Sequence, residues 1–230
     1  MKAAVITFPG SNCDDDAMYT LREFAKFQVT NLWHTDRPAL GEFQLVVVPG
    51  GFSYGDYLRS GAVASLSPIM EKVKEYAAAG GNVIGICNGF QILCETGLLP
   101  GALAKNESSK FVCKDIYLKV ENNQTPWTSA MKAGEVIQLP IAHGDGRYVS
   151  GFTAKSSAEV DGVLFTYCDA QGKALPGSNP NGSEHAIAGV ANRARNVFGL
   201  MPHPERATDL RSQHGKKIWQ SLLSHLEGKH

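Results

Sequence analysis

The sequence lacks an excess of charge of either sign. Its 22 lysines and arginines equal its 22 aspartates and glutamates in number, so the formal net charge is zero. A protein that binds nucleic acid usually carries a basic excess on one face. Apolar residues make up 43% of the 230 residues, which is more than a disordered chain contains. We therefore expect a folded protein that binds no nucleic acid.

Long apolar runs are missing as well. The longest ones, such as residues 45–48, fall far short of the ~18–20 residues that cross a bilayer, so we expect no membrane span. Residues 1–8 run into Pro9-Gly10 without the longer apolar core or the small-residue cleavage site of a secretory signal. Export is therefore not expected.

Cysteines at metal-binding spacing are also absent. The five cysteines are odd in number and scattered, with no Cys-x-x-Cys motif, which is typical of neither a disulfide framework nor a zinc site. We expect a reducing, cytoplasmic location and no bound metal. No Gly-x-x-x-x-Gly-Lys-Ser/Thr motif occurs, so we expect no phosphate-binding loop of that type.

The chain does contain a regular succession of strand and helix patterns in its first half. Strand patterns lie at residues 2–8, 29–33, 45–48 and 82–86, and helix patterns at residues 14–27, 68–79 and 90–96. Strands that alternate with helices indicate a mostly parallel sheet with helices on both faces.

The second half has strand patterns with little helix between them. They lie at residues 111–120, 136–139, 163–167, 187–191 and 197–200, joined by turns rich in Gly, Asn and Pro. We expect these strands to extend the sheet in antiparallel fashion. A last helix, at residues 216–226, has an apolar stripe that we expect to pack on the sheet.

Together these patterns predict the fold class and the domain organisation. The class is α/β, with an open, mostly parallel twisted sheet, helices on both faces and antiparallel additions. A length of 230 residues fits one large domain over residues 1–230 better than two small ones.

The sharpest local motif is Gly-Ile-Cys-Asn-Gly at residues 85–89, between a predicted strand and a predicted helix. A nucleophile on such a tight turn has a strained backbone, and glycines on both sides allow the close packing that the turn needs. The turn places the Cys87 sulfur at the amino end of a helix, where N–H groups and the helix dipole favour the thiolate. We predict that Cys87 is a nucleophile and that the other four cysteines are structural.

A thiolate needs a proton carrier, and His203 is the strongest candidate among seven histidines. It lies in Met201-Pro202-His203-Pro204-Glu205, where we expect the prolines to hold the segment extended, so that residues two apart project to the same side. Glu205 would then orient the imidazole, and His203 would exchange a proton with Cys87 and deliver one to the leaving group.

Acyl chemistry also needs donors for an oxyanion. The N–H of Asn88, directly after the nucleophile, is one candidate. The second comes from Pro49-Gly50-Gly51-Phe52, which leaves the predicted strand at residues 45–48 at the same edge of the sheet. A glycine can turn its N–H toward a ligand because no Cβ interferes, so Gly51 is the predicted second donor.

These motifs resemble class I, triad-type glutamine amidotransferases. The resemblance lies in Gly85-Ile86-Cys87-Asn88-Gly89-Phe90-Gln91, in the Pro-Gly-Gly-Phe-Ser-Tyr-Gly-Asp segment at 49–56 and in Met201-Pro202-His203-Pro204-Glu205-Arg206. Further segments are similar to the glutaminase subunits of phosphoribosylformylglycinamidine synthases in purine biosynthesis. They are residues 10–14, 95–103, 120–122, 143–148 and 179–183. The resemblance covers essentially the whole chain.

The resemblance implies a reaction and a set of roles. Cys87 would attack the carboxamide of glutamine, release ammonia and form a thioester that water hydrolyses to glutamate, with His203 and Glu205 completing the triad. Gln91 would help to hold the substrate, and Gly50 and Phe52 would flank the oxyanion loop. We expect residues 143–148 to border the same pocket or the partner surface. The family pattern has Glu where Asp145 stands.

The resemblance also implies partners. The ammonia would pass to a synthetase subunit, which a small accessory subunit would accompany. The ATP and Mg²⁺ of the complex would bind to the synthetase, with no cofactor in this chain.

Two other functions are compatible with the motifs. One is a cysteine hydrolase or peptidase of similar topology that acts alone. The other is an inactive binding module with a vestigial nucleophile turn, against which the intact set of Cys87, His203 and Glu205 argues.

Overall fold

The computed structural model describes residues 1–151, 157, 160, 162–209 and 212–228. Its main feature is a nine-stranded sheet. The strand order is β2 (Gln28–Trp33), β1 (Lys2–Thr7), β3 (Leu45–Val48), β4 (Asn82–Ile86), β11 (Val197–Leu200), β10 (Ile187–Ala191), β9 (Val163–Cys168), β6 (Val112–Val120) and β7 (Val136–His143). Neighbours from β2 to β11 are parallel, and neighbours from β11 to β7 are antiparallel. The predicted parallel half with antiparallel additions is confirmed.

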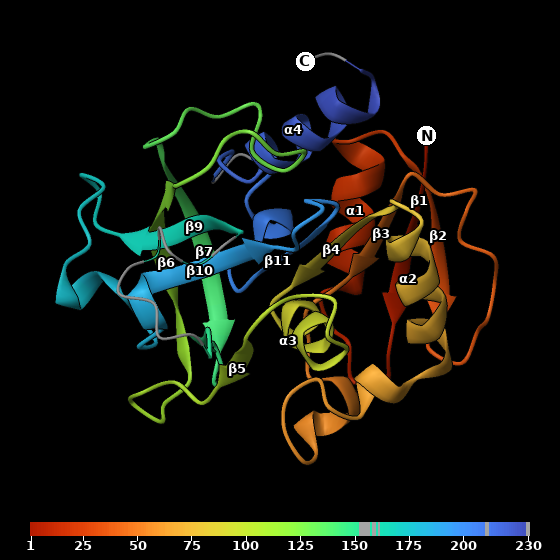
Figure 1. Ribbon diagram of the computed structural model, residues 1–230, viewed down its shortest axis with the longest axis horizontal. Coiled ribbons are helices and arrows are strands. Elements are labelled where there is room, and N and C mark those ends of the chain that lie inside the picture. The colour runs from red at the N-terminus through yellow and green to blue at the C-terminus, as the bar shows by residue number, and fades with distance from the viewer. Residues whose placement is uncertain (152–156, 158–159, 161, 210–211, 229–230) are drawn as a thin grey trace.

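The helices lie beside the parallel half. They are α1 (Asp14–Glu23), α2 (Pro68–Ala78), α3 (Asn88–Glu95) and α4 (Lys216–Leu226). Helices α1 and α4 contact the short helix η6 (Pro204–Arg206), whereas α2 and α3 contact η2 (Ala64–Leu66). Figure 1 shows the parallel strands with α1, α2 and α3 in one half of the molecule and the antiparallel strands in the other. The α/β class is confirmed.

The burial of the central strands explains why short apolar runs in the sequence predicted them correctly. Every residue of β3, β4 and β11 is buried, whereas edge strand β2 buries only Leu32 fully. A strand covered on both faces carries apolar residues continuously rather than in alternation. The carboxyl ends of β3, β4 and β11 lie side by side, and the segments that follow them carry the predicted site.

Several predicted boundaries were wrong by a few residues. Helix α1 ends at Glu23 rather than at residue 27, helix α3 already begins at Asn88, and β7 continues to His143. A small second sheet of β5 (Ala102–Ala104) and β8 (Arg147–Val149) was not predicted. Three-residue strands are too short to show a hydrophobic period.

The apolar stripe of α4 is buried in the core. Ile218, Trp219 and Leu222 are almost fully inaccessible, and Ser221 Oγ accepts a hydrogen bond of 2.9 Å from the N–H of Ala130. Its neighbours therefore include residues 129 and 130 and the short helix η6. No helix in the described ranges is long and apolar enough to cross a membrane.

Truncation of Leu222 tests whether α4 is part of the core. Because Leu222 is fully buried, Leu222→Ala is expected to lower the free energy of unfolding by about 2–5 kcal/mol. Gln220→Ala changes an exposed residue of the same helix and is expected to change stability by less than about 0.5 kcal/mol. Urea unfolding measures both, and equal small effects would contradict a core position for α4.

Candidate active site

Cys87 occupies a strained turn between β4 and α3. Its φ is 51° and its ψ is −106°, which is a rare conformation for a residue with a Cβ and costs about 1–3 kcal/mol. The Cys87 N–H donates to the carbonyl of Leu200 at 2.8 Å, and the Cys87 carbonyl accepts from the N–H of Gln91 at 3.2 Å. Backbone bonds on both sides thus hold the turn that the sequence predicted.

The flanking glycines are required by space. A side-chain carbon at Gly85 would lie 2.6 Å from the carbonyl oxygen of Gly89, and one at Gly89 would collide with the carbonyl oxygen of Val48. Since these are backbone atoms, they cannot rotate away. Gly85 and Gly89 therefore allow α3 to start directly against β3 and β4, as predicted.

His203 and Glu205 form a buried pair. His203 Nδ1 lies 2.7 Å from Glu205 Oε1, and the two side chains are 2% and 0% exposed. The predicted extended backbone was wrong, because residues 204–206 form a 3₁₀ turn. The turn still brings the two side chains together.

The charge of Glu205 determines the protonation of His203. Burial by itself disfavours the imidazolium, but the carboxylate of Glu205 and the nearby Cys87 sulfur outweigh it and hold the pKa of His203 well above its usual value. His203 Nε2 has no hydrogen bond of ordinary geometry, although Cys87 is close enough to affect its pKa. The imidazole is therefore stabilised in its charged form beside the thiol.

Gly50 shows how closely the site residues approach one another. A side-chain carbon at Gly50 would lie 3.0 Å from His203 Cε1 and 3.4 Å from Cys87 Cβ. The loop after β3 thus packs between the nucleophile and the histidine. The structure brings Cys87, His203 and Glu205 together; their catalytic roles remain predictions.

A cavity of 110 Å³ adjoins the Cys87 thiol, and we call it the Cys87 cavity. It is lined by Gly51, Phe52, Asp56, Ser60, Cys87, Gln91, Phe111, Ala142, His143, Gly144 and Asp145. Four of these residues were predicted for the site, and the 143–148 segment borders the cavity as expected. Phe52 is 45% exposed and stacks on Phe111 at a centroid distance of 6.4 Å.

The predicted oxyanion donors lie at this cavity and at the start of α3. Gly51 has a φ of 145° and no room for a Cβ, which would lie 2.7 Å from Ser11 Cα. Asn88 is the first residue of α3, where backbone N–H groups lack intrahelical partners. Asn88 also anchors the loop, because its Oδ1 accepts from the N–H of Ser53 at 3.2 Å. Their role as donors remains a prediction.

Gln91 is held at both ends of its amide. Its Nε2 donates to the carbonyl of Asp145 at 2.6 Å, and its Oε1 accepts from Asn88 Nδ2 at 2.8 Å. Gln91 therefore ties α3 to the 143–148 segment. Its predicted part in substrate binding remains a prediction.

Two carboxylates border the cavity without a catalytic prediction. Ser60 Oγ donates to Asp145 Oδ2 at 2.7 Å. Burial raises the pKa of Asp56, and the charge of Asp145 raises it further. Asp56 ends the short 3₁₀ helix η1 (Ser53–Asp56), and Ser60 lies in the turn that follows. Neither segment has a periodic pattern, so sequence reasoning did not assign these residues to the site.

Cys13 lies beside the triad residues, which the sequence did not predict. Arg206 Nη2 donates to Cys13 Sγ at 3.3 Å, and a side-chain carbon at Gly50 would lie 3.0 Å from that sulfur. Burial raises the pKa of Cys13, although His203 acts in the opposite direction. One ligand atom each from Cys13, His203 and Glu205 lies within 4.8 Å of the others. The absence of a metal from the site remains a prediction.

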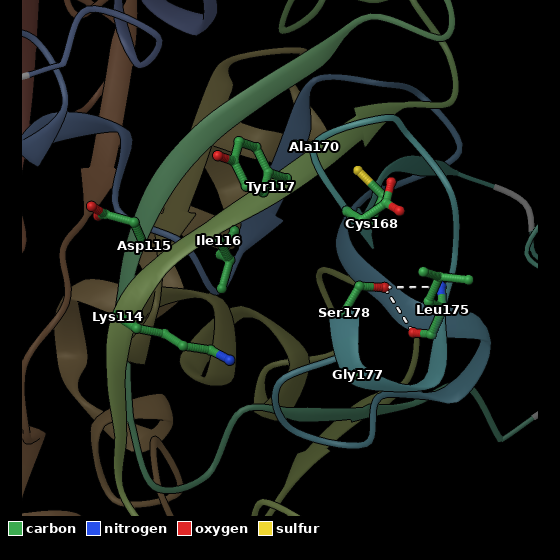
Figure 2. Close-up of a pocket in the computed structure, with 10 residues that line it drawn as sticks. Lys114, Asp115, Ile116, Tyr117, Cys168, Ala170, Leu175, Gly177 and Ser178 are labelled. Carbon is green, nitrogen blue, oxygen red and sulfur yellow. Dashed lines mark hydrogen bonds between the residues drawn. The ribbon is translucent and has the colours of Figure 1, made fainter.

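A second cavity lies away from the triad. It has a volume of 360 Å³ and lies between residues 114–117 of β6 and the 168–178 segment. Figure 2 shows Ser178 at its wall, where Ser178 Oγ donates to the carbonyl of Leu175 at 2.8 Å and accepts from its N–H at 3.0 Å. None of the residues predicted for the site lines it.

The fold and the site define a class of protein. Residues 1–224 match the family of CobB/CobQ-like glutamine amidotransferase domains. The chain is 52% identical over 225 residues to phosphoribosylformylglycinamidine synthase subunit PurQ of Salinibacter ruber, covering 96% of this chain and 95% of that one. It is also 52% identical over 229 residues to the PurQ subunit of Pseudothermotoga lettingae, covering 99% and 97%.

A solved structure agrees. A chain in the structure of PurLQS from Thermotoga maritima is 46% identical and superimposes with a TM-score of 0.86, and the match covers 98% of each chain. A glutamine amidotransferase of Thermotoga maritima, at 17% identity and a TM-score of 0.61 over 100% of this chain and 97% of that one, shares the fold. The chain belongs to the PurQ family of phosphoribosylformylglycinamidine synthase subunits.

Substitution of Gly89 tests the packing that holds the Cys87 turn. Because a Cβ at Gly89 collides with a backbone oxygen, Gly89→Ala is expected to lower the free energy of unfolding by about 1–3 kcal/mol. Gly41→Ala is the control, since no atom lies within 4 Å of the added carbon there. Thermal unfolding compares the two variants, and equal midpoints would contradict the proposed constraint.

Substitution of Glu205 tests the origin of the His203 charge. Glu205→Gln removes the carboxylate, which is the strongest of the groups that raise the pKa of His203, so this pKa is expected to fall. NMR titration of the imidazole measures this shift. Asp16→Asn, which removes the carboxylate paired with Arg206, is expected to leave that pKa near the wild-type value.

The raised pKa of His203 also predicts how the stability of Glu205→Gln depends on pH. A histidine whose folded-state pKa is raised stabilises the fold fully below its unfolded pKa, and this stabilisation is lost as pH rises through the folded pKa. The stability deficit of Glu205→Gln is therefore expected to be largest between about pH 5 and 6.5 and to shrink at higher pH. A deficit that grows with pH would contradict a charged His203.

Proposed function

We propose that this chain is the glutaminase subunit of a phosphoribosylformylglycinamidine synthase, with residues 1–230 forming one glutaminase domain. The observation that supports this proposal best is the buried His203–Glu205 pair, at 2.7 Å, next to a cysteine on a strained turn. Membership of the PurQ family favours glutamine as the substrate.

The reaction follows from the positions of these groups. The Cys87 thiolate attacks the carboxamide carbon of glutamine, and the carbonyl oxygen becomes an oxyanion. The N–H groups of Gly51 and Asn88 stabilise it; removal of one such donor typically costs about 10²–10³ in rate. His203 then protonates the nitrogen, the carbon–nitrogen bond breaks and ammonia leaves. Water gives one proton to His203 and attacks the thioester, and collapse of the adduct releases the Cys87 thiolate and glutamate, whose carboxyl group loses the second proton to solvent.

Glu205 and the cavity residues assist without reacting. Glu205 accepts a hydrogen bond from His203 Nδ1, so that Nε2 is the atom available to Cys87 and to the leaving group. Phe52 and Gly50 flank the oxyanion loop, and Gln91 braces the cavity wall. The carboxylate of Glu205 also stabilises the imidazolium that forms at each proton transfer.

The ammonia requires a second protein. We infer that the chain assembles with a small accessory subunit and a synthetase subunit, because its Thermotoga maritima relative belongs to a PurLQS structure. ATP and Mg²⁺ would bind to the synthetase, and no cofactor would bind here. The complex would act in purine biosynthesis in the cytoplasm.

The two alternatives are less well supported. A peptidase that acts alone is not favoured by the relatives, which are PurQ subunits of phosphoribosylformylglycinamidine synthases. An inactive module would not need the strained Cys87 backbone. Labelling with an electrophilic glutamine analogue separates the proposed enzyme from the inactive module. The proposed enzyme is modified at Cys87, whereas labelling at no site would favour the inactive module.

Substitution of Cys87 tests the proposed reaction. In the assembled complex, Cys87→Ala is expected to abolish glutamine-dependent synthesis and to leave ammonia-dependent synthesis intact, because only the thioester step is lost. Cys113→Ala, at an exposed cysteine, is expected to leave both activities unchanged. Loss of both activities in Cys87→Ala would assign Cys87 a structural role, and loss of neither would refute the proposal.

A further inference from the structure

His143 is a buried imidazole at the Cys87 cavity that the triad does not use. It is the last residue of β7, is 3% exposed and borders the cavity together with Cys87. The residue before it, Ala142, places its carbonyl oxygen 3.8 Å from Cys87 Sγ. His143 therefore follows directly on the backbone group that contacts the nucleophile.

Asn106 determines which nitrogen of His143 carries the proton. Asn106 Nδ2 donates to the carbonyls of Lys110 and His143, both at 2.9 Å. Its Oδ1 accepts from the N–H of Gly146 at 2.9 Å and lies 3.1 Å from His143 Nδ1. Carbonyls accept and N–H groups donate, so the orientation of the amide is fixed. His143 Nδ1 must then be the donor to Asn106 Oδ1.

The ring is also kept neutral. Burial lowers the pKa of His143 to about 4, and the positive charge of His203 contributes to this shift. Gly146 packs on the ring so closely that a Cβ there would collide with it. With the proton on Nδ1 and the ring neutral, Nε2 carries a lone pair in a fixed position.

This lone pair has no partner among the residues that the structure describes. His143 Nε2 is buried and accepts no hydrogen bond from any described residue. An unpaired buried acceptor is destabilising by about 1–3 kcal/mol, and such groups are concentrated at functional sites. The acceptor that the protein leaves open therefore suits a ligand with an N–H donor.

Glutamine supplies such a donor at this place. Once its carbonyl oxygen lies at Gly51 and Asn88, its carboxamide nitrogen still presents two N–H groups. Ala142 and His143 both line the Cys87 cavity, and the Ala142 carbonyl oxygen lies 3.8 Å from Cys87 Sγ. The γ-carboxylate of glutamate has no N–H and would place a negative oxygen against these acceptors.

We propose that His143 Nε2 accepts a hydrogen bond from the carboxamide NH₂ of the substrate, and that His143 thereby selects the amide over the γ-carboxylate product. The inference rests on the proposed function, which supplies glutamine as the substrate. His143 makes and breaks no covalent bond in this role. Asn106 is a positioning residue, because it acts only by fixing the tautomer.

The test compares an amide with a substrate that lacks N–H groups. In the complete complex, kcat/KM is measured for glutamine and for the γ-methyl ester of glutamate, whose reaction differs only in that methanol leaves. His143→Phe removes the acceptor and is expected to lower kcat/KM about tenfold for glutamine and less than about twofold for the ester. His143→Gln, which can place an amide oxygen near the position of Nε2, is expected to retain most of the preference for glutamine.

The alternative outcomes are distinct. Equal losses for both substrates in His143→Phe would show a purely structural role and overturn the inference. A wild-type complex that hydrolyses neither substrate would refute the proposed function instead. The pH profile of glutamine hydrolysis is expected to keep its shape in His143→Phe. Loss of one of its apparent pKa values would assign His143 an acid–base role and also overturn the inference.

A binding measurement covers the case in which His143→Phe does not fold. In Cys87→Ala protein within the complex, the ¹⁵N resonance of His143 Nε2 is expected to shift when glutamine is added, because the lone pair becomes hydrogen-bonded. Glutamate at the same occupancy is expected to cause no comparable shift. An unchanged resonance at saturating glutamine would overturn the inference.

Discussion

The carbonyl oxygen of Val48 lies where any side chain on Gly89 would have to be, and this close approach of α3 to β3 holds Cys87 in its strained conformation. The strain, about 1–3 kcal/mol, is offset by the packing of fully buried strands on either side. If α3 moved outward to relieve it, Cys87 would lose its position beside His203 and the Cys87 cavity would lose one wall. The rest of the site depends on this contact between backbone atoms.

Three strand ends converge on that contact. The segment after β3 supplies Gly50 and Gly51, the segment after β4 supplies Cys87 and Asn88, and the segment after β11 supplies His203 and Glu205. In open α/β sheets, sites form outside the carboxyl ends of the strands, and here β3, β4 and β11 are parallel neighbours. The antiparallel half adds a fourth wall at the end of β7, which brings His143 beside the nucleophile.

The two histidines of the site differ in charge for physical reasons. Both are buried, so both lose hydration of the charged form. His203 faces the carboxylate of Glu205 and is held charged, whereas His143 faces an amide oxygen and the positive His203 and is held neutral. The ring of His203 can therefore carry a second proton, whereas Nε2 of the neutral His143 ring can only accept a hydrogen bond.

The sequence was sufficient to predict the parts of the site that lie within single motifs. The turn at Cys87, with glycines on both sides, and the His203–Glu205 pair each occupy a few consecutive residues. Strand patterns also predicted most of the sheet, because its central strands are continuously apolar.

Contacts between distant segments could not be predicted from local patterns. Asn106 meets His143 across 37 residues, and Cys13 meets Arg206 across 193; no local pattern marks either pair. The 3₁₀ turn at residues 204–206 was missed because a proline fits both an extended segment and the first position of a helical turn.

The central claim is that Cys87 forms a thioester with the substrate. Rapid acid quenching of the assembled complex during glutamine turnover, followed by peptide mass spectrometry, tests it most directly. The account predicts a glutamyl group on Cys87 and on no other cysteine. Steady glutamine hydrolysis with no adduct under conditions that preserve thioesters, or an adduct on Cys13 instead, would contradict it.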